Sequence, residues 1–216
     1  MRVLAMLVMC VQPIAALACG ARVCIVDPET LSLPRQITFD TAPSGQGPGY
    51  LFDDLLILDG AGFGERFAGQ TLNGSDTHDG ITGAALRPLT LLAGAAGQNL
   101  SVVAFMGISV LNGYGPRGYP HRDGQGEGAI AILFDDDQSE ISIHFRGGES
   151  GSADALFLDR SGGVLARVPI TPLGETVVGF ARAGTVQDIA GIVLTNTDPQ
   201  GLAIDTIRFG KSIGLG

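Results

Sequence analysis

Alternation of apolar and polar residues is the dominant pattern after residue 35. The segments Gln36–Asp40 and Glu140–Arg146 place apolar side chains at every second position, a period that predicts half-buried β-strands. Leu100–Met106 and Gly128–Phe134 are apolar at both parities, which predicts strands covered on two faces. No segment keeps an apolar period of about 3.6 residues between helix caps, so we expect few helices.

Turn signals divide the chain into short strands. The segment Asp154–Val168 contains two apolar runs around Ser161–Gly163, which is the sequence pattern of a β-hairpin. The acidic stretch Phe134–Glu140 joins two strands and is also expected to form a hairpin turn. Roughly ten to twelve strands at this spacing predict one antiparallel β-sandwich, an all-β domain that occupies residues 36–210.

The N-terminus has the three parts of a secretory signal peptide, which we assign to residues 1–18. Arg2 supplies the positive charge, Val3–Val11 is a continuous apolar run, and Ala16–Ala18 gives the small-residue pattern of a cleavage site. A buried N-terminal strand or helix is the alternative. Residues 19–35 then form an N-terminal segment and residues 211–216 a short tail, in a protein expected to be secreted or periplasmic.

The cysteines agree with export. Cys10 falls inside the apolar run, whereas Cys19 and Cys24 would remain in the mature chain. In an oxidising compartment such a pair is expected to form a disulfide that pins the N-terminal segment. The alternative is lipidation of Cys19, which would anchor the protein to a membrane. A zinc site is disfavoured because no second Cys or His pair follows at ligand spacing.

The charge balance excludes one class of partner. The chain has 22 acidic and 13 basic residues, with a net charge of −9. Binding to a phosphate backbone requires a clustered basic surface, so we expect no nucleic-acid partner. An acidic surface suits solubility and divalent cations.

Two short segments carry a resemblance to a known group. The strand that ends in "TFD" and the closing "GLAIDTIRFG" resemble the jelly-roll β-sandwiches of secreted bacterial proteins. This group includes jelly rolls similar to carbohydrate-binding modules, and it also includes many exported PEP-CTERM proteins. The tail "KSIGLG" has no Pro-Glu-Pro motif, so the sorting signal of the latter is missing. Thr206 also stands where such proteins usually have Asn.

The last strand places a carboxylate among apolar residues. Asp205 has the same parity as Ala203, Ile207 and Phe209, which we expect to face the core. The resemblance implies that the first and last strands are neighbours and that Asp40 and Asp205 share a structural calcium ion, completed by carbonyls and water. Two alternatives remain: Asp205 accepts hydrogen bonds from backbone N–H groups or pairs with an Arg, or a bulge changes the parity and leaves it in solvent.

A long segment between two strands, Leu111–Gly128, is the candidate ligand site. It is expected to lack regular structure, and loops of this length in compact domains are often functional. Aromatic rings stack on sugars, while charged side chains bind hydroxyl groups. The candidate residues are Tyr114, Tyr119, His121, Arg122 and Asp123, with Arg117 and Glu127 nearby. A flexible loop with incidental charges is the alternative.

Catalytic motifs find little support. Gly148–Ser152 lacks the final glycine of a nucleophile elbow, and Gly60–Glu65 does not complete a dinucleotide-binding motif. We therefore expect a non-catalytic protein that binds a glycan or another extracellular ligand. The alternatives are an envelope structural or adhesion protein with a protein partner, and an enzyme acting on glycans through an unrecognised pair of acids. The absence of Trp disfavours a flat aromatic glycan platform.

Overall fold

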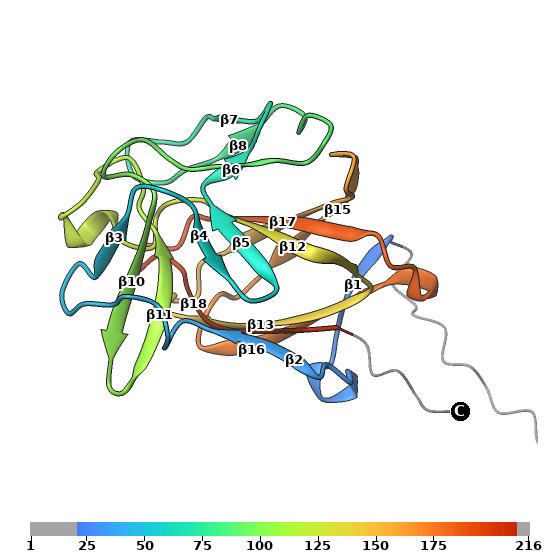
Figure 1. Ribbon diagram of the computed structural model, residues 1–216. Helices are drawn as coiled ribbons and strands as arrows, with labels where there is room; N and C mark the ends of the chain where they lie inside the picture. Colours follow the sequence, from blue (N-terminus) through green and yellow to red (C-terminus); the bar gives the residue numbers. More distant parts are fainter. Residues whose placement is uncertain (1–20, 211–216) are drawn as a thin grey trace, which may run out of the picture.

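The computed structural model describes residues 21–210, which form two antiparallel β-sheets packed face to face (Figure 1). The first sheet has the order β1 (Val23–Val26), β16 (Thr176–Arg182), β13 (Glu140–Arg146), β18 (Ala203–Phe209), β11 (Ile108–Gly113), β10 (Leu100–Phe105) and β3 (Tyr50–Phe52), with β2 (Arg35–Thr38) paired to β18. The second has the order β15 (Val164–Ile170), β14 (Ala153–Leu158), β17 (Ile189–Asn196), β12 (Ile130–Gln138), β5 (Ala61–Gly64) and β4 (Leu56–Leu58).

Small elements complete the domain. The short pairs are β6 (Arg66–Phe67) with β9 (Leu91–Leu92) and β7 (Thr71–Leu72) with β8 (Ile81–Thr82), and the single 3₁₀ turns are η1 (Pro28–Thr30), η2 (Arg122–Gly124) and η3 (Ala183–Thr185). Within residues 21–210, no helix is long and apolar enough to cross a bilayer.

The connectivity is that of a jelly roll. From β11 to β18 the chain passes repeatedly between the sheets, and only the hairpin of β14 and β15 stays within one. The resulting orders, β11-β18-β13-β16 and β12-β17-β14-β15, are the two four-stranded sheets of a double Greek key. The predicted fold class is therefore confirmed.

The core lies between the sheets and follows the predicted alternation. Ile141, Ile143 and Phe145 of β13 are fully buried there, while Ser142 and His144 lie on the outer face. A second apolar cluster covers the outer face of the other sheet; it contains Phe67, Leu91, Ala131, Leu156 and Val193. This cover explains why Gly128–Phe134 is apolar at both parities.

Three strand predictions need comment. β2 pairs with β18, with Ile37 opposite Ile207, so the first predicted strand does lie beside the last. The expected hairpin turn at Phe134–Glu140 is wrong: β12 continues to Gln138, and β13 belongs to the other sheet. Leu100–Met106 is covered on both faces only near its start, because Phe105 and Met106 are exposed.

The N-terminal predictions fall largely beyond the described part of the chain. Residues 1–18, Cys19 and the tail 211–216 lie outside the described residues. Cys24 is buried in β1, which pairs with β16 at the edge of the first sheet. The Cys19–Cys24 disulfide and the signal peptide stay predictions.

We expect Phe145→Ala to reduce the free energy of unfolding by about 3–5 kcal/mol, because it removes a fully buried ring from the core between the sheets. Urea denaturation would measure this loss. Val164→Ala, at an exposed position, is the control and should stay within about 0.5 kcal/mol of the wild type. An equal effect of the two substitutions would contradict the assignment of the core.

Candidate functional site

A β-bulge in the last described strand answers the question of the buried carboxylate. Opposite β13, Ile204 pairs with Phe145 and Thr206 pairs with His144. Asp205 is thus an additional residue in β18 at this register shift, and the parity of the strand changes there. The bulge named as one alternative is present, but it does not leave Asp205 in solvent; the other alternative, pairing with an Arg, is the one observed.

The bulge lets both halves of β18 bury apolar side chains. Ile204 before the bulge and Ile207 and Phe209 after it all lie in the core. Asp205 lies on the outer face with a side chain that is 12% exposed. The prediction that Ala203 faces the core in the same row as Ile207 is wrong, because the alternation of side chains between the two faces changes at the bulge.

Asp205 is held by an arginine rather than left to solvent. Arg146 Nε and Nη2 donate to Asp205 Oδ2 over 3.1 and 3.0 Å, and Thr206 Oγ1 donates to Oδ1 over 3.1 Å. His144 Nδ1 lies 3.3 Å from the same Oδ2, and Glu175 lies 3.4 Å from Arg146 on the other side. Glu175, Arg146 and Asp205 thus alternate in charge, and the donors on Asp205 offset the cost of burying its carboxylate.

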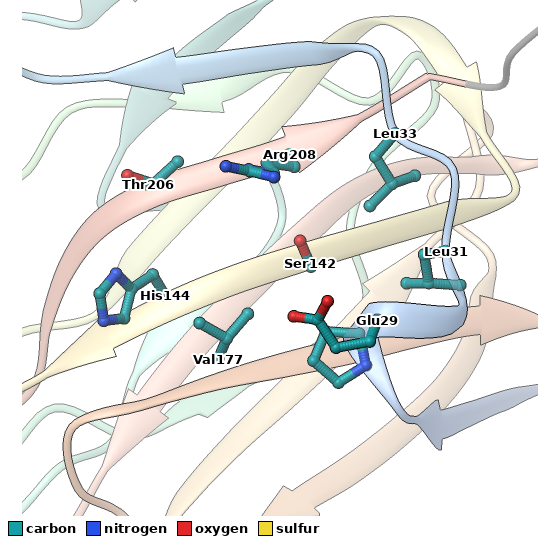
Figure 2. A pocket seen from close by; sticks show the side chains of 9 residues that line it. Glu29, Leu31, Leu33, Ser142, His144, Val177, Thr206 and Arg208 are labelled. Atoms are coloured by element: carbon teal, nitrogen blue, oxygen red, sulfur yellow. The ribbon is translucent and has the colours of Figure 1, made fainter.

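Beside these side chains, the outer face of the first sheet is hollowed into a groove of about 300 Å³ (Figure 2). Its floor comes from β13, β16 and β18, and its wall from η1 and the residues that follow. The lining residues are Pro28, Glu29, Leu31, Leu33, Ser142, His144, Val177, Thr206 and Arg208.

Local sequence explains the wall. Asp27 Oδ1 accepts a hydrogen bond from the Glu29 N–H over 3.0 Å, and Pro28 occupies the first position of η1. An acidic cap followed by proline favours this turn because both residues suit its first positions. The turn holds Glu29 at the groove.

The groove presents polar groups that are not used up internally. Among the described residues, neither Arg208 nor Glu29 takes part in an ion pair. Both side chains are exposed and line the groove. Figure 2 shows the Ser142 hydroxyl directed toward Arg208, with Glu29 on the opposite side of Ser142. No hydrogen bond in the described part of the chain joins Ser142 to His144.

The predicted calcium residues have separate partners. Asp40 Oδ1 accepts the Ser109 N–H over 2.8 Å, whereas Asp205 is engaged by Arg146. Within residues 21–210, no group of three or more His, Cys, Asp and Glu side chains is arranged to hold a metal ion.

The Leu111–Gly128 segment is more ordered than predicted. Its first residues belong to β11, and Tyr114 forms an isolated β-bridge with Gln125. The turn η2 lies between these two residues, directly before Gln125. The Tyr114 ring is fully buried and its hydroxyl donates to the Pro48 carbonyl over 3.2 Å. Burial, with Tyr119 nearby, raises the pKa of Tyr114 to about 12. The prediction that Tyr114 offers a stacking face is wrong, since no face of the ring reaches solvent.

The other loop residues remain at the surface. Tyr119 is 38% exposed and packs edge-on against Tyr114, with ring centroids 5.7 Å apart. His121 and Arg122 are exposed. Asp123 accepts a hydrogen bond from Arg117 over 2.9 Å. The loop therefore presents Tyr119, His121 and Arg122 together, while Asp123 is already engaged.

Sequence reasoning missed a group of buried acids near this loop. Glu65 pairs with Arg66, and Asp79 accepts the Ala129 N–H over 3.1 Å. Glu127 lies 3.8 Å from Arg117, but its Oε2 has no hydrogen-bond partner within residues 21–210. Burial raises the pKa of all three carboxyls. No local signal distinguishes them from the exposed acids of neighbouring loops.

Comparison with known proteins adds little about function. No family model matches the chain, and no curated protein matches it. A family 6 carbohydrate-binding module from Clostridium stercorarium, solved with cellobiose, is 15% identical over 52% of this chain and 82% of its own, with a TM-score of 0.31.

Two other solved structures are similarly distant. A family 29 carbohydrate-binding module in complex with mannohexaose is 11% identical, covers 70% of this chain and 93% of its own, and has a TM-score of 0.33. The enzymatically active domain of a tailspike protein from bacteriophage CBA120 is 18% identical over 66% of this chain and 19% of its own, with a TM-score of 0.28. At these scores none of them informs the position of a site in this chain.

Calcium binding stays a prediction with a direct test. A cation that binds only the folded state raises the melting temperature by mass action. The prediction requires a higher melting temperature in calcium than in EDTA, and Asp40→Asn should remove the difference. Equal melting temperatures in calcium and EDTA would contradict it.

Glu127→Gln should stabilise the protein at pH 7 by about 1 kcal/mol, because it replaces a buried carboxylate that lacks a full set of partners. Burial raises the pKa of Glu127 in the folded state, so the folded protein holds this proton more tightly than the unfolded chain. Its contribution to stability is present below the ordinary pKa of glutamate and is lost as pH rises through the raised value.

Denaturant unfolding between pH 4 and pH 8 would measure this effect. The variant should show a smaller decline in stability over this range than the wild type. Asp76→Asn, an exposed change in a neighbouring loop, is the matched control and should leave the decline unchanged. A Glu127→Gln profile parallel to that of the wild type would contradict the assignment.

Proposed function

We propose that this chain is a non-catalytic β-sandwich that binds a hydroxyl-rich ligand, a glycan above all, in the groove of the first sheet. The observation that carries the proposal is that Arg208 and Glu29, which take part in no ion pair within residues 21–210, meet at a groove that apolar side chains also line. Binding sites for small molecules combine an apolar lining with a few placed polar groups in this way.

The polar groups match the chemistry of sugar hydroxyls. Each hydroxyl donates one hydrogen bond and accepts others. Arg208 supplies donors, Glu29 supplies acceptors, and Ser142 supplies both, while the Thr206 hydroxyl, which donates to Asp205, supplies an acceptor. Hydrogen bonds to charged groups are the stronger ones, so Arg208 and Glu29 are expected to contribute most.

The apolar wall suits the C–H faces of a sugar ring. Val177, Leu31 and Leu33 line the groove together with Pro28. The chain has no Trp, so this recognition would depend on an aliphatic cleft rather than on a flat aromatic platform. That requirement favours a short oligosaccharide or a chain end lying in the groove.

The ion pair of Asp205 and Arg146 holds His144 in place at the groove. His144 lies against Asp205, which Arg146 holds through two N–H groups. A side chain fixed before binding loses less entropy on binding. His144 is therefore proposed as a preorganised ligand-binding residue, without a catalytic role.

The exposed part of the loop is the second candidate location. Tyr119, His121 and Arg122 place a half-exposed ring beside donors, which could bind either a glycan or an envelope protein. Export to the periplasm or the exterior, with a Cys19–Cys24 disulfide, completes the proposal and is supported by the N-terminal sequence pattern.

Glycan-array screening followed by calorimetry on the best ligand would test the groove. Arg208→Ala and His144→Ala should each weaken binding by roughly tenfold or more, because each removes hydrogen bonds at the centre of the site. Tyr119→Ala is the matched control and should bind as the wild type does. Loss of binding in Tyr119→Ala alone would move the site to the loop, and a wild type that binds no glycan would overturn the proposed ligand class.

A further inference from the structure

Two segments of the first sheet and its connecting loops carry no charged residue. Residues 41–52 and 88–116 contain no Asp, Glu, Lys, Arg or His, in a chain with 22 acidic and 13 basic residues. The two uncharged segments lie side by side, because Gly45 bridges to Val103 and β3 pairs with β10. The uncharged segments thus form one contiguous part of the first sheet, which Asp40, Asp53 and Arg122 contact at its border.

The hairpin of β10 and β11 carries exposed apolar residues of these segments. Phe105 is 59% exposed and Met106 is 89% exposed. Figure 1 shows this hairpin projecting beyond the neighbouring strands. Phe105 pairs with Ile108, so the backbone of the hairpin is hydrogen-bonded almost to its tip, and only the turn residues Met106 and Gly107 lie beyond the ladder.

The turn itself is unfavourable for its residue. Met106 has φ of 48° and Gly107 has φ of 89°, a left-handed conformation that Asn and Gly adopt more readily than Met. Met106 therefore lowers the stability of the fold in two ways: its apolar side chain is exposed to water, and its backbone is in an unfavourable conformation. Residues with such backbone strain are often found at functional sites.

We propose that the Phe105–Met106 tip inserts into the interface of an uncharged, zwitterionic lipid bilayer. A convex, charge-free tip with a paired backbone fits a fluid apolar phase, where unpaired backbone groups and charges are excluded. Half-exposed Tyr50 on the neighbouring strand is a residue type that favours the headgroup level.

The surrounding charges select the lipid class and limit the depth. Asp40 accepts the Ser109 N–H beside the hairpin, so its exposed carboxylate lies close behind the tip and stays at the headgroups. This carboxylate and the net charge of −9 repel anionic lipids. The contact is therefore shallow, reversible and independent of the groove.

The absence of Trp makes the test specific. Phe105→Trp creates a single fluorescent reporter at the tip of the full-length chain. With phosphatidylcholine vesicles we expect a blue shift of its emission and quenching by lipids brominated in the acyl chains. Val164→Trp, at an exposed position on β15, is the control and should show neither change.

A second variant removes the tip without endangering the fold. Phe105→Ser with Met106→Asn keeps a turn that Asn tolerates, so the melting temperature should not fall below that of the wild type. Its partition coefficient into the same vesicles should drop by at least about tenfold, because most exposed apolar area of the tip is gone. Arg208→Ala should partition as the wild type does, whatever its effect on glycan binding.

Several results would overturn the proposal. They are equal vesicle binding by wild type and the double variant, an unchanged emission of the tip reporter, and binding that needs anionic lipid and disappears at high salt. All variants share residues 1–20, so a difference between them reports the tip alone. A reporter that is shielded by an added envelope protein but not by vesicles would assign the tip to a protein partner instead.

Discussion

The register shift at Asp205 is the constraint on which the first sheet depends. Side chains of a strand alternate between its faces, so a regular β18 would bury either Ile204 or the pair Ile207 and Phe209, but not all three. One additional residue solves this conflict by changing the parity in mid-strand. The residue placed at the change must then tolerate the outer face, and Asp205 does so because Arg146 donates two N–H groups to it.

The same ion pair links packing to the groove. Asp205 stands between Arg146, which reaches toward Glu175, and His144, which lines the groove. A carboxylate buried beside a guanidinium is stable only while both partners stay in place. The position of His144 is therefore tied to the geometry of the bulge, and the shape of the groove depends on the packing on the core side of the same strand.

Sequence reasoning succeeded where alternation is unbroken. The parity of β13 and the hairpin of β14 and β15 follow directly from the side-chain pattern. It left the placement of Asp205 open because a bulge leaves no mark in the spacing of apolar residues. It failed at Tyr114 because the Gly-rich sequence around this ring does not indicate whether the ring is buried or exposed. The groove escaped notice because its lining residues come from segments far apart along the chain.

The composition of the groove has a consequence for biosynthesis. Its wall, η1 and the residues after it, is among the first parts of the domain to be translated, and its floor includes β18, among the last. A nascent chain on the ribosome therefore has no complete groove until translation of the domain has finished. Because contacts between such distant segments also form slowly, the groove is complete only once the jelly roll has closed.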